Sequence, residues 1–118
     1  MNKNIIELNE ANFDEEVLNA TQPVLVEFWA DWSGPCKAMA PMLESVVRDD
    51  AVPIKFGRVN VQHYETLTEQ YGVRAVPTLL LFSQGSLQDQ IVGPTTEQAV
   101  RERLENLNDK VVKRSPLH

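Results

Sequence analysis

Hydrophobic residues follow two different spacings along this chain, one typical of strands and one typical of helices. Residues 24–29 form a nearly continuous apolar run that only Glu27 interrupts. Such a run is typical of a strand that is buried on both faces. Residues 34–49 instead repeat apolar side chains at helical spacing, with a kink expected at Pro41 because proline has no N–H for the helical hydrogen bond. The pattern therefore predicts a buried strand that leads directly into a helix.

Shorter apolar runs predict the remaining elements. Strands are expected at residues 5–8, 54–61, 78–82 and 87–92, and helices at residues 12–18, 64–71 and from residue 95 or 96 onward. Asn12 and Glu15 have the spacing of a capping box at the start of the first helix. A turn at residues 83–86 contains Gly85 and predicts that the last two strands form a hairpin.

The resulting order of elements is β-α-β-α-β-α-β-β-α. Strands that alternate with helices predict a parallel core, and the final hairpin adds antiparallel strands to it. The expected fold class is therefore α/β, with a central mixed five-stranded sheet that carries helices on both faces. We expect a single domain over residues 1–112 and a frayed tail at residues 113–118.

Composition narrows the chemistry that this domain can carry out. With 118 residues, 42% of them hydrophobic, the chain is long enough to bury a core of its own. A lone cysteine, Cys36, excludes an internal disulfide. His63 and His118 are the two histidines, so the usual set of cysteine and histidine ligands for zinc cannot be assembled. We therefore expect neither a metal nor a cofactor.

The charge of the chain argues against two classes of partner. Its net charge is −6, whereas nucleic acid and anionic membranes attract a concentrated basic face. No apolar run approaches the roughly 20 residues of a membrane span. Residues 1–7 lack the apolar core of a secretory signal. We expect a cytoplasmic monomer that binds neither nucleic acid nor membrane.

The most informative segment lies where the predicted buried strand meets the next helix. Residues 32–37 read Trp-Ser-Gly-Pro-Cys-Lys. Unpaired N–H groups and the helix dipole at such a helix start stabilise a nearby negative charge, for example a thiolate. In a Cys-x-x-Cys arrangement the first cysteine attacks a disulfide from this position, and the second cysteine, one turn later, resolves the mixed disulfide.

This segment resembles the motif of the thioredoxin family, Trp-Cys-Gly-Pro-Cys-Lys. Further stretches agree in order and spacing over most of the chain, from Ile5 to about Leu107. They include Phe-Trp-Ala at 28–30, Ala-Pro at 40–41, Tyr-Gly-Val-Arg at 71–74, Val-Pro-Thr-Leu-Leu-Leu-Phe at 76–82 and Val-Gly at 92–93. The resemblance implies the thioredoxin fold and the reduction of protein disulfides.

The resemblance also assigns roles to individual residues. Cys36 matches the resolving cysteine, and Ser33 stands where the attacking cysteine belongs. Glu27 stands where the family has a buried acid that assists proton transfer, and Arg58 where a lysine pairs with that acid. Pro77 matches the cis-proline that faces the motif.

A groove for an extended substrate is implied as well. Its matching residues are Trp32, Gly34, Pro35, Val76, Pro77 and Gly93. The implied partners are polypeptides with disulfides or extended segments. For a dithiol form of the chain, the implied electron donor is similar to thioredoxin reductase.

The chemistry of the residues themselves limits this assignment. Ser33 is a good helix cap, but it is a poor nucleophile because the motif supplies no neighbouring base. Cys36 by itself cannot support dithiol turnover. Both alternating sets of the strand at residues 24–29 are otherwise apolar, so Glu27 is expected to be at least partly buried. Burial raises the pKa of Glu27 and Arg58 opposes that rise, so a proton-transfer role and a purely structural role are both open.

Two hypotheses on function follow. In the first, the chain is a disulfide reductase with a Cys-to-Ser substitution at Ser33, because the surroundings of the motif are intact. In the second, it is a naturally redox-inactive module that binds polypeptides or acts as a chaperone, through backbone pairing at Val76.

Overall fold

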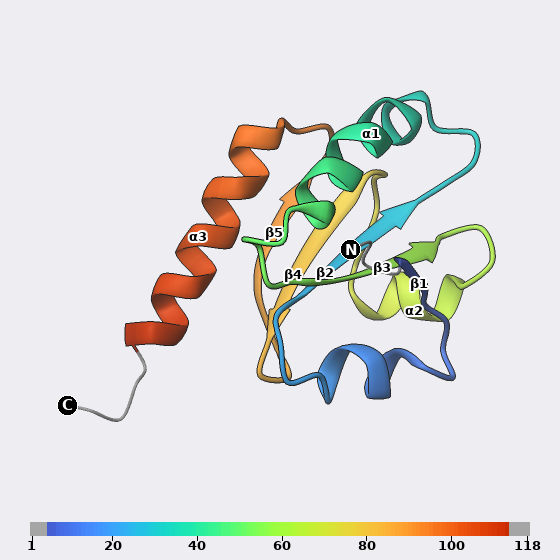
Figure 1. Cartoon of the computed structure of the whole chain (residues 1–118). Coiled ribbons are helices and arrows are strands. Elements are labelled where there is room, and N and C mark those ends of the chain that lie inside the picture. Colours follow the sequence, from blue (N-terminus) through green and yellow to red (C-terminus); the bar gives the residue numbers. More distant parts are fainter. Residues whose placement is uncertain (1–4, 114–118) are drawn as a thin grey trace.

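The computed structural model describes residues 5–113 and contains one five-stranded mixed sheet (Figure 1). The strands are β1 (Ile5–Glu7), β2 (Val24–Trp29), β3 (Lys55–Asn60), β4 (Thr78–Ser83) and β5 (Ser86–Val92), in the sheet order β1-β3-β2-β4-β5. The helices are η1 (Asp14–Leu18), α1 (Gly34–Arg48), α2 (Glu65–Gln70) and α3 (Glu97–Lys113). Strands β1, β3 and β2 run parallel, while β4 and β5 are antiparallel to their neighbours. The predicted element order and fold class are confirmed.

Helices cover both faces of the sheet and create two separate cores (Figure 1). Helices α1 and α3 pack on one face, where α3 buries Val100, Leu104 and Leu107. Helices η1 and α2 pack on the other face through Val17 and Leu67. Strand β2 lies at the centre of the sheet, and its residues 24–28 are buried. This confirms the interpretation of its apolar run as a strand covered on both faces.

The hairpin between β4 and β5 forms where the sequence predicts it. Its two central residues, Gln84 and Gly85, have φ of 54° and 79°. A two-residue turn with both φ values positive matches the twist of the flanking strands, and glycine adopts this conformation without steric cost.

The predicted start of the first helix is wrong. η1 begins at Asp14, is wound as a π-helix and has no side-chain cap. Asn12 instead accepts a hydrogen bond from the backbone N–H of Asn9 at 2.8 Å and donates one to the carbonyl of Glu7 at 3.0 Å. Because these bonds close the turn after β1, the side chain of Asn12 is not available to Glu15.

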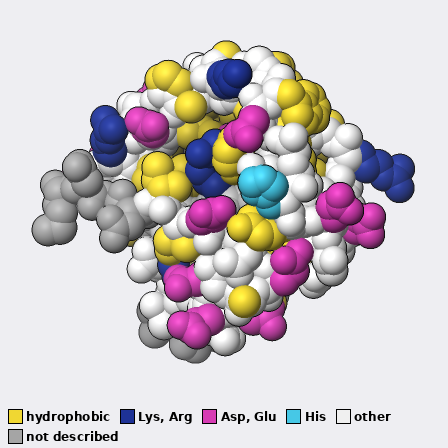
Figure 2. All heavy atoms as spheres, turned by 90° about the vertical axis from the view of Figure 1, so that its right-hand side faces the viewer, with side chains coloured by type: hydrophobic (Ala, Val, Ile, Leu, Met, Phe, Trp, Pro, Cys, Tyr) yellow, Lys and Arg dark blue, Asp and Glu magenta, His cyan; other side chains and the backbone are white. Residues whose placement is uncertain are grey.

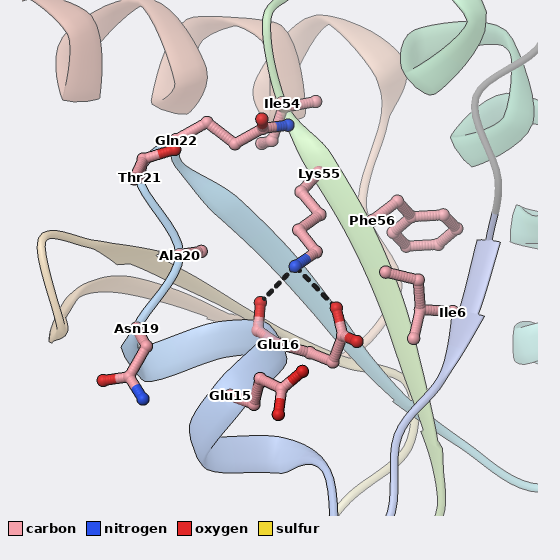
Figure 3. A pocket seen from close by; sticks show the side chains of 10 residues that line it. All are labelled: Ile6, Glu15, Glu16, Asn19, Ala20, Thr21, Gln22, Ile54, Lys55 and Phe56. Atoms are coloured by element: carbon pink, nitrogen blue, oxygen red, sulfur yellow. Dashed lines mark hydrogen bonds and ion pairs between the residues drawn. The ribbon is translucent and has the colours of Figure 1, made fainter.

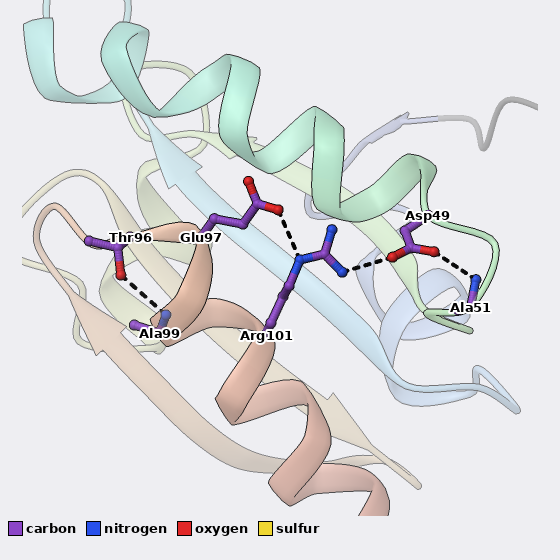
Figure 4. Close-up of polar contacts among 6 residues, drawn as sticks. All are labelled: Asp49, Ala51, Thr96, Glu97, Ala99 and Arg101. Carbon is purple, nitrogen blue, oxygen red and sulfur yellow. Dashed lines mark hydrogen bonds and ion pairs between the residues drawn. The ribbon is translucent and has the colours of Figure 1, made fainter.

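An ion pair ties the last helix to the end of α1, and a side chain caps the start of this helix (Figure 4). Thr96 caps α3 by accepting the N–H of Ala99 at 3.2 Å. Arg101 reaches Asp49, just after α1, at 2.8 Å and Glu97 at 2.9 Å. Of the expected tail, only Lys113 lies within the described residues, as the last residue of α3, and the boundary at residue 112 stays a prediction.

Candidate functional site

Ser33 and Cys36 lie at the junction of β2 and α1. Ser33 is the residue before α1, with extended φ and ψ of −87° and 112°, and its Oγ accepts the N–H of Cys36 at 3.2 Å. Gly34 and Pro35 open the helix, where proline costs no hydrogen bond because the first N–H groups have no helical partner. Both Ser33 and Cys36 are buried, each 2% exposed. The predicted capping role of Ser33 is confirmed.

The segment before β4 completes this end of the sheet. The peptide bond between Val76 and Pro77 is cis, and the carbonyl of Pro77 accepts the N–H of Gly93 at 2.8 Å. Gly93 has a φ of 87°, a conformation that L-residues rarely adopt. The hydrogen bond ties Pro77 to the residue that follows β5.

An apolar pocket of about 360 Å³, here called the groove pocket, lies beside the motif. Its lining comprises Trp32, Val61, Thr68, Val73, Arg74, Ala75 and Val76. Trp32 is 68% exposed and forms one wall, so a large indole surface faces solvent. Of the predicted groove residues, Trp32 and Val76 share this pocket, whereas Gly34, Pro35, Pro77 and Gly93 are not part of its lining. Val61 was missed, since a lone valine at the end of a predicted strand carries no signal of its own.

Glu27 and Arg58 meet because parallel strands β2 and β3 place them side by side in register. Arg58 Nε donates to Glu27 Oε1 at 2.9 Å, and Glu27 is only 1% exposed. The other carboxylate oxygen, Oε2, is buried and has no hydrogen-bond partner among the described residues. Desolvation raises the pKa of Glu27 above its ordinary value, and the charge and hydrogen bond of Arg58 oppose that rise. The expected burial and pairing of Glu27 are confirmed.

Two hollows adjoin this ion pair. A cavity of about 20 Å³ is lined by Ile5, Glu27, Ala40, Leu43, Glu44, Phe56 and Arg58, and it is large enough for one water molecule. A wider pocket of about 360 Å³, here called the outer pocket, is lined by Ile5, Ile6, Glu7, Trp29, Asp31, Arg58, Asn60 and His63. Figure 2 looks toward the end of the sheet where β2 and β3 finish, and acidic, basic and hydrophobic side chains are mixed there around a hollow.

Gln62 fixes the loop between the groove pocket and the outer pocket. Its side-chain Oε1 accepts a hydrogen bond from the backbone N–H of Asp31 at 3.1 Å. Its backbone N–H donates a hydrogen bond to Asn60 Oδ1 at 2.9 Å. Asp31 lines the outer pocket, while its neighbour Trp32 lines the groove pocket. The sequence does not predict this role, because a single glutamine after a strand has no distinctive spacing.

The opposite end of the sheet carries none of the predicted site residues. A pocket of about 490 Å³ there is lined by Ile6, Glu15, Glu16, Asn19, Ala20, Thr21, Gln22, Ile54, Lys55 and Phe56 (Figure 3). Its one basic group, Lys55 Nζ, is already bound to the side chain and the carbonyl of Glu16, each at 2.7 Å. The charge of Lys55 is therefore neutralised within the fold.

The described residues contain neither a cluster of metal ligands nor a membrane-spanning helix. Among the side chains that the structure describes, no three of histidine, cysteine or acidic type are grouped as metal ligands would be. In the same part of the chain, no helix has the length and apolar character needed to cross a membrane.

Comparisons with known proteins agree with this geometry. The family model described as thioredoxin matches residues 4–106. A thioredoxin of Pseudomonas aeruginosa is 41% identical over 93 residues, which cover 79% of this chain and 86% of that protein. A thioredoxin of Buchnera aphidicola is 39% identical over 109 residues, covering 92% of this chain and the whole of that protein.

A solved structure supports the fold independently. The crystal structure of the Malassezia sympodialis thioredoxin, described as a member of a pan-allergen family, superposes with a TM-score of 0.79. It covers 88% of this chain and 90% of its own length at 24% identity, so it bears on the fold alone. The family match and the identities above, together with the sheet order and the Ser33–Cys36 junction, show that this chain belongs to the thioredoxin family.

Proposed function

We propose that this chain is a thioredoxin-type protein-disulfide oxidoreductase in which Ser33 replaces the attacking cysteine, so that it does not turn over as given. The thioredoxin family supports a redox oxidoreductase role. The observation that carries the proposal is the placement of Ser33 Oγ at the start of α1, bound to the N–H of Cys36. If position 33 held a cysteine, its thiolate would lie at the same helix start, where unpaired N–H groups and the helix dipole stabilise a negative charge.

The chain as given cannot complete the reduction of a disulfide, because the reaction consumes two thiols of the reductase. Reduction of one disulfide takes two electrons and two protons, which two thiols supply as they become a disulfide. A thiolate at position 33 would attack the substrate disulfide and release one substrate thiolate. Cys36 would then attack the resulting mixed disulfide and release the second. With one cysteine in the chain, the internal disulfide that ends this sequence cannot form.

The other site residues support the proposal by position. Glu27, held by Arg58, would accept the proton of Cys36 during resolution, because burial raises the pKa of Glu27 above its ordinary value and its carboxylate therefore binds a proton more readily. An extended polypeptide would lie against Trp32, Gly34, Pro35, Val76, Pro77 and Gly93.

The partners follow from the same proposal. They are protein disulfides and, for the dithiol form, a donor similar to thioredoxin reductase. A reducing compartment such as the cytoplasm suits this role, because thiols stay reduced there.

Restoring the cysteine tests the proposal directly. Ser33→Cys should reduce insulin disulfides in the presence of a thioredoxin reductase and NADPH, whereas the chain as given should not. Ser33→Ala is the control for loss of the hydroxyl, and Ser33→Cys combined with Cys36→Ser is the control for the resolving step. Both controls should be inactive. A folded Ser33→Cys variant without turnover would contradict the oxidoreductase assignment.

A polypeptide-binding module is the second candidate, favoured by the groove pocket, which is open and apolar without any contribution from a thiol. Gly93→Leu and Gly72→Leu form a matched pair for this test. Both glycines have positive φ and open space at the position of a Cβ, so both variants carry similar backbone strain of about 1–2 kcal/mol. Binding of an extended peptide, followed by amide shifts, should be lost in Gly93→Leu alone. Because Gly93 lies outside the lining of the groove pocket, equal binding by both variants would exclude the surface around Gly93 from the docking site.

A further inference from the structure

Glu27 and Arg58 form a stack with a third residue, Trp29. Trp29 follows Glu27 by two positions on β2, so both side chains leave the same face of the strand. The guanidinium carbon of Arg58 lies 4.1 Å from the centre of the Trp29 ring. A cation at this distance over an indole face is attracted by the ring electrons, and the attraction grows when the pair is partly desolvated. Arg58 is therefore held from two sides, by a ring and by a carboxylate.

The contact between Arg58 and Glu27 is one-sided. Nε donates to Oε1 at 2.9 Å, whereas Oε2 has no partner among the described residues and is buried. Arginine and carboxylate often pair through two parallel hydrogen bonds, which satisfy both oxygens. Here the two oxygens of Glu27 differ: one is bound to a cation and the other is not.

We propose that Trp29 is a positioning residue for Glu27 that acts through Arg58. Its ring holds the guanidinium so that Nε binds Oε1, and Oε2 is left as the oxygen that gains and loses the proton. The inference rests on the acid–base role proposed for Glu27, and it adds the residue that sets which oxygen and which cation take part.

Other charged groups surround the stack and stay constant in the test. From α1, Glu44 lines the cavity of about 20 Å³ next to Glu27 and is itself paired with Arg48 at 3.1 Å. Glu7, Asp31 and His63 line the outer pocket together with Arg58. Variants that leave these groups in place isolate the contribution of the ring.

A double-mutant cycle on the titration of Glu27 tests the proposal. Carboxyl-carbon NMR would follow Glu27 in the chain as given, in Trp29→Leu, in Arg58→Met and in the double variant. Loss of the ring should loosen the guanidinium and raise the Glu27 midpoint by about half a pH unit or more. In the Arg58→Met background, Trp29→Leu should have no further effect. Trp32→Leu, which removes the indole on the groove side, should leave the midpoint unchanged.

Two results would overturn the proposal. If Trp29→Leu shifted the midpoint equally with and without Arg58, the ring would act by excluding water and not through the cation. If Arg58→Met shifted it and Trp29→Leu did not, the ring would have no positioning role. Trp29→Phe keeps an aromatic face and serves in the same cycle if the leucine variant does not fold. Because the readout needs no turnover, an inactive Ser33→Cys variant would refute the proposed function without affecting this result.

Discussion

The two faces of strand β2 differ sharply although they belong to the same six residues. One face presents Val24, Val26 and Phe28 to η1 and α2 and is entirely apolar. The other presents Leu25, Glu27 and Trp29 toward the side of the sheet that carries α1 and α3, and it includes a buried carboxylate. The alternation of side chains along the strand thus separates an entirely apolar face from a face with a buried acidic side chain.

The apolar face is reinforced by contacts between aromatic rings, whereas the aromatic contact described on the other face is that of Arg58 with Trp29. Phe13, Tyr71 and Phe82 pack with ring centroids 5.2–5.8 Å apart. Apolar burial there needs no partner for a polar atom. On the face of Glu27, one buried oxygen has no hydrogen-bond partner in the part of the chain that the structure describes, and desolvation raises the pKa of this carboxyl. Burial of the apolar face offsets the cost of burying the acid on the other face.

The largest expected effect is a loss of stability when a side chain of the apolar face is truncated. Phe28→Ala should lower the free energy of unfolding by about 3–5 kcal/mol, because Phe28 is fully buried and its removal leaves a cavity. The Glu27 titration, measured by carboxyl-carbon NMR in the fraction that stays folded, should not change. Phe28→Leu, which removes fewer buried atoms, should cause a smaller loss of stability. A shifted Glu27 midpoint in either variant would show that the two faces are not independent.

The second prediction concerns the pH dependence of stability when the carboxyl group of Glu27 is replaced by a neutral amide. Because burial raises the folded pKa of Glu27 above its ordinary 4.5, the unfolded chain ionises first as pH rises, and stability falls from near that value up to the folded pKa. Glu27→Gln should remove this decline. Its advantage over the chain as given should therefore grow with pH, by about 1.4 kcal/mol for each unit of raised pKa.

Urea unfolding from about pH 4 to about pH 8 measures this difference. Below the ordinary pKa of glutamate both chains carry a neutral side chain at position 27, which provides an internal control. A constant difference across the range would mean that Glu27 ionises alike in the folded and unfolded chain.

The smallest effect concerns the helix that covers the charged face. Ser33→Ala removes the hydroxyl that accepts the N–H of Cys36, and it should cost about 1 kcal/mol in the free energy of unfolding. Thr96→Ala removes the matching cap of α3 at a similar cost and is the control far from the motif in sequence. Amide shifts at Trp32 and Cys36 should change in the first variant only. A Ser33→Ala variant without loss of stability would contradict the capping role.

The sequence alone determined the elements, the helix cap and the burial of Glu27, because these depend on local properties. Apolar spacing placed β2 and α1 with nearly correct bounds, and residues 83–86 placed the hairpin turn. Ser33 was identified as a cap from its chemistry and its place before a helix, and Glu27 as buried from the residues on either side of it. Such inferences succeed where neighbours within a few residues set the outcome.

Only the tertiary structure decided which distant groups share a hydrogen bond. The side chain of Asn12 could either cap a helix or close the turn after β1, and in the fold it closes the turn through hydrogen bonds with Asn9 and Glu7. Gln62 fixes Asp31 across 31 positions of sequence. The pairing of Arg58 with Glu27 was expected from the resemblance, whereas the position of its guanidinium over the ring of Trp29 was not. The sequence lists the donors and acceptors, but their pairing depends on strand register and side-chain packing. For that reason the unpartnered oxygen of Glu27 becomes visible only in the folded chain.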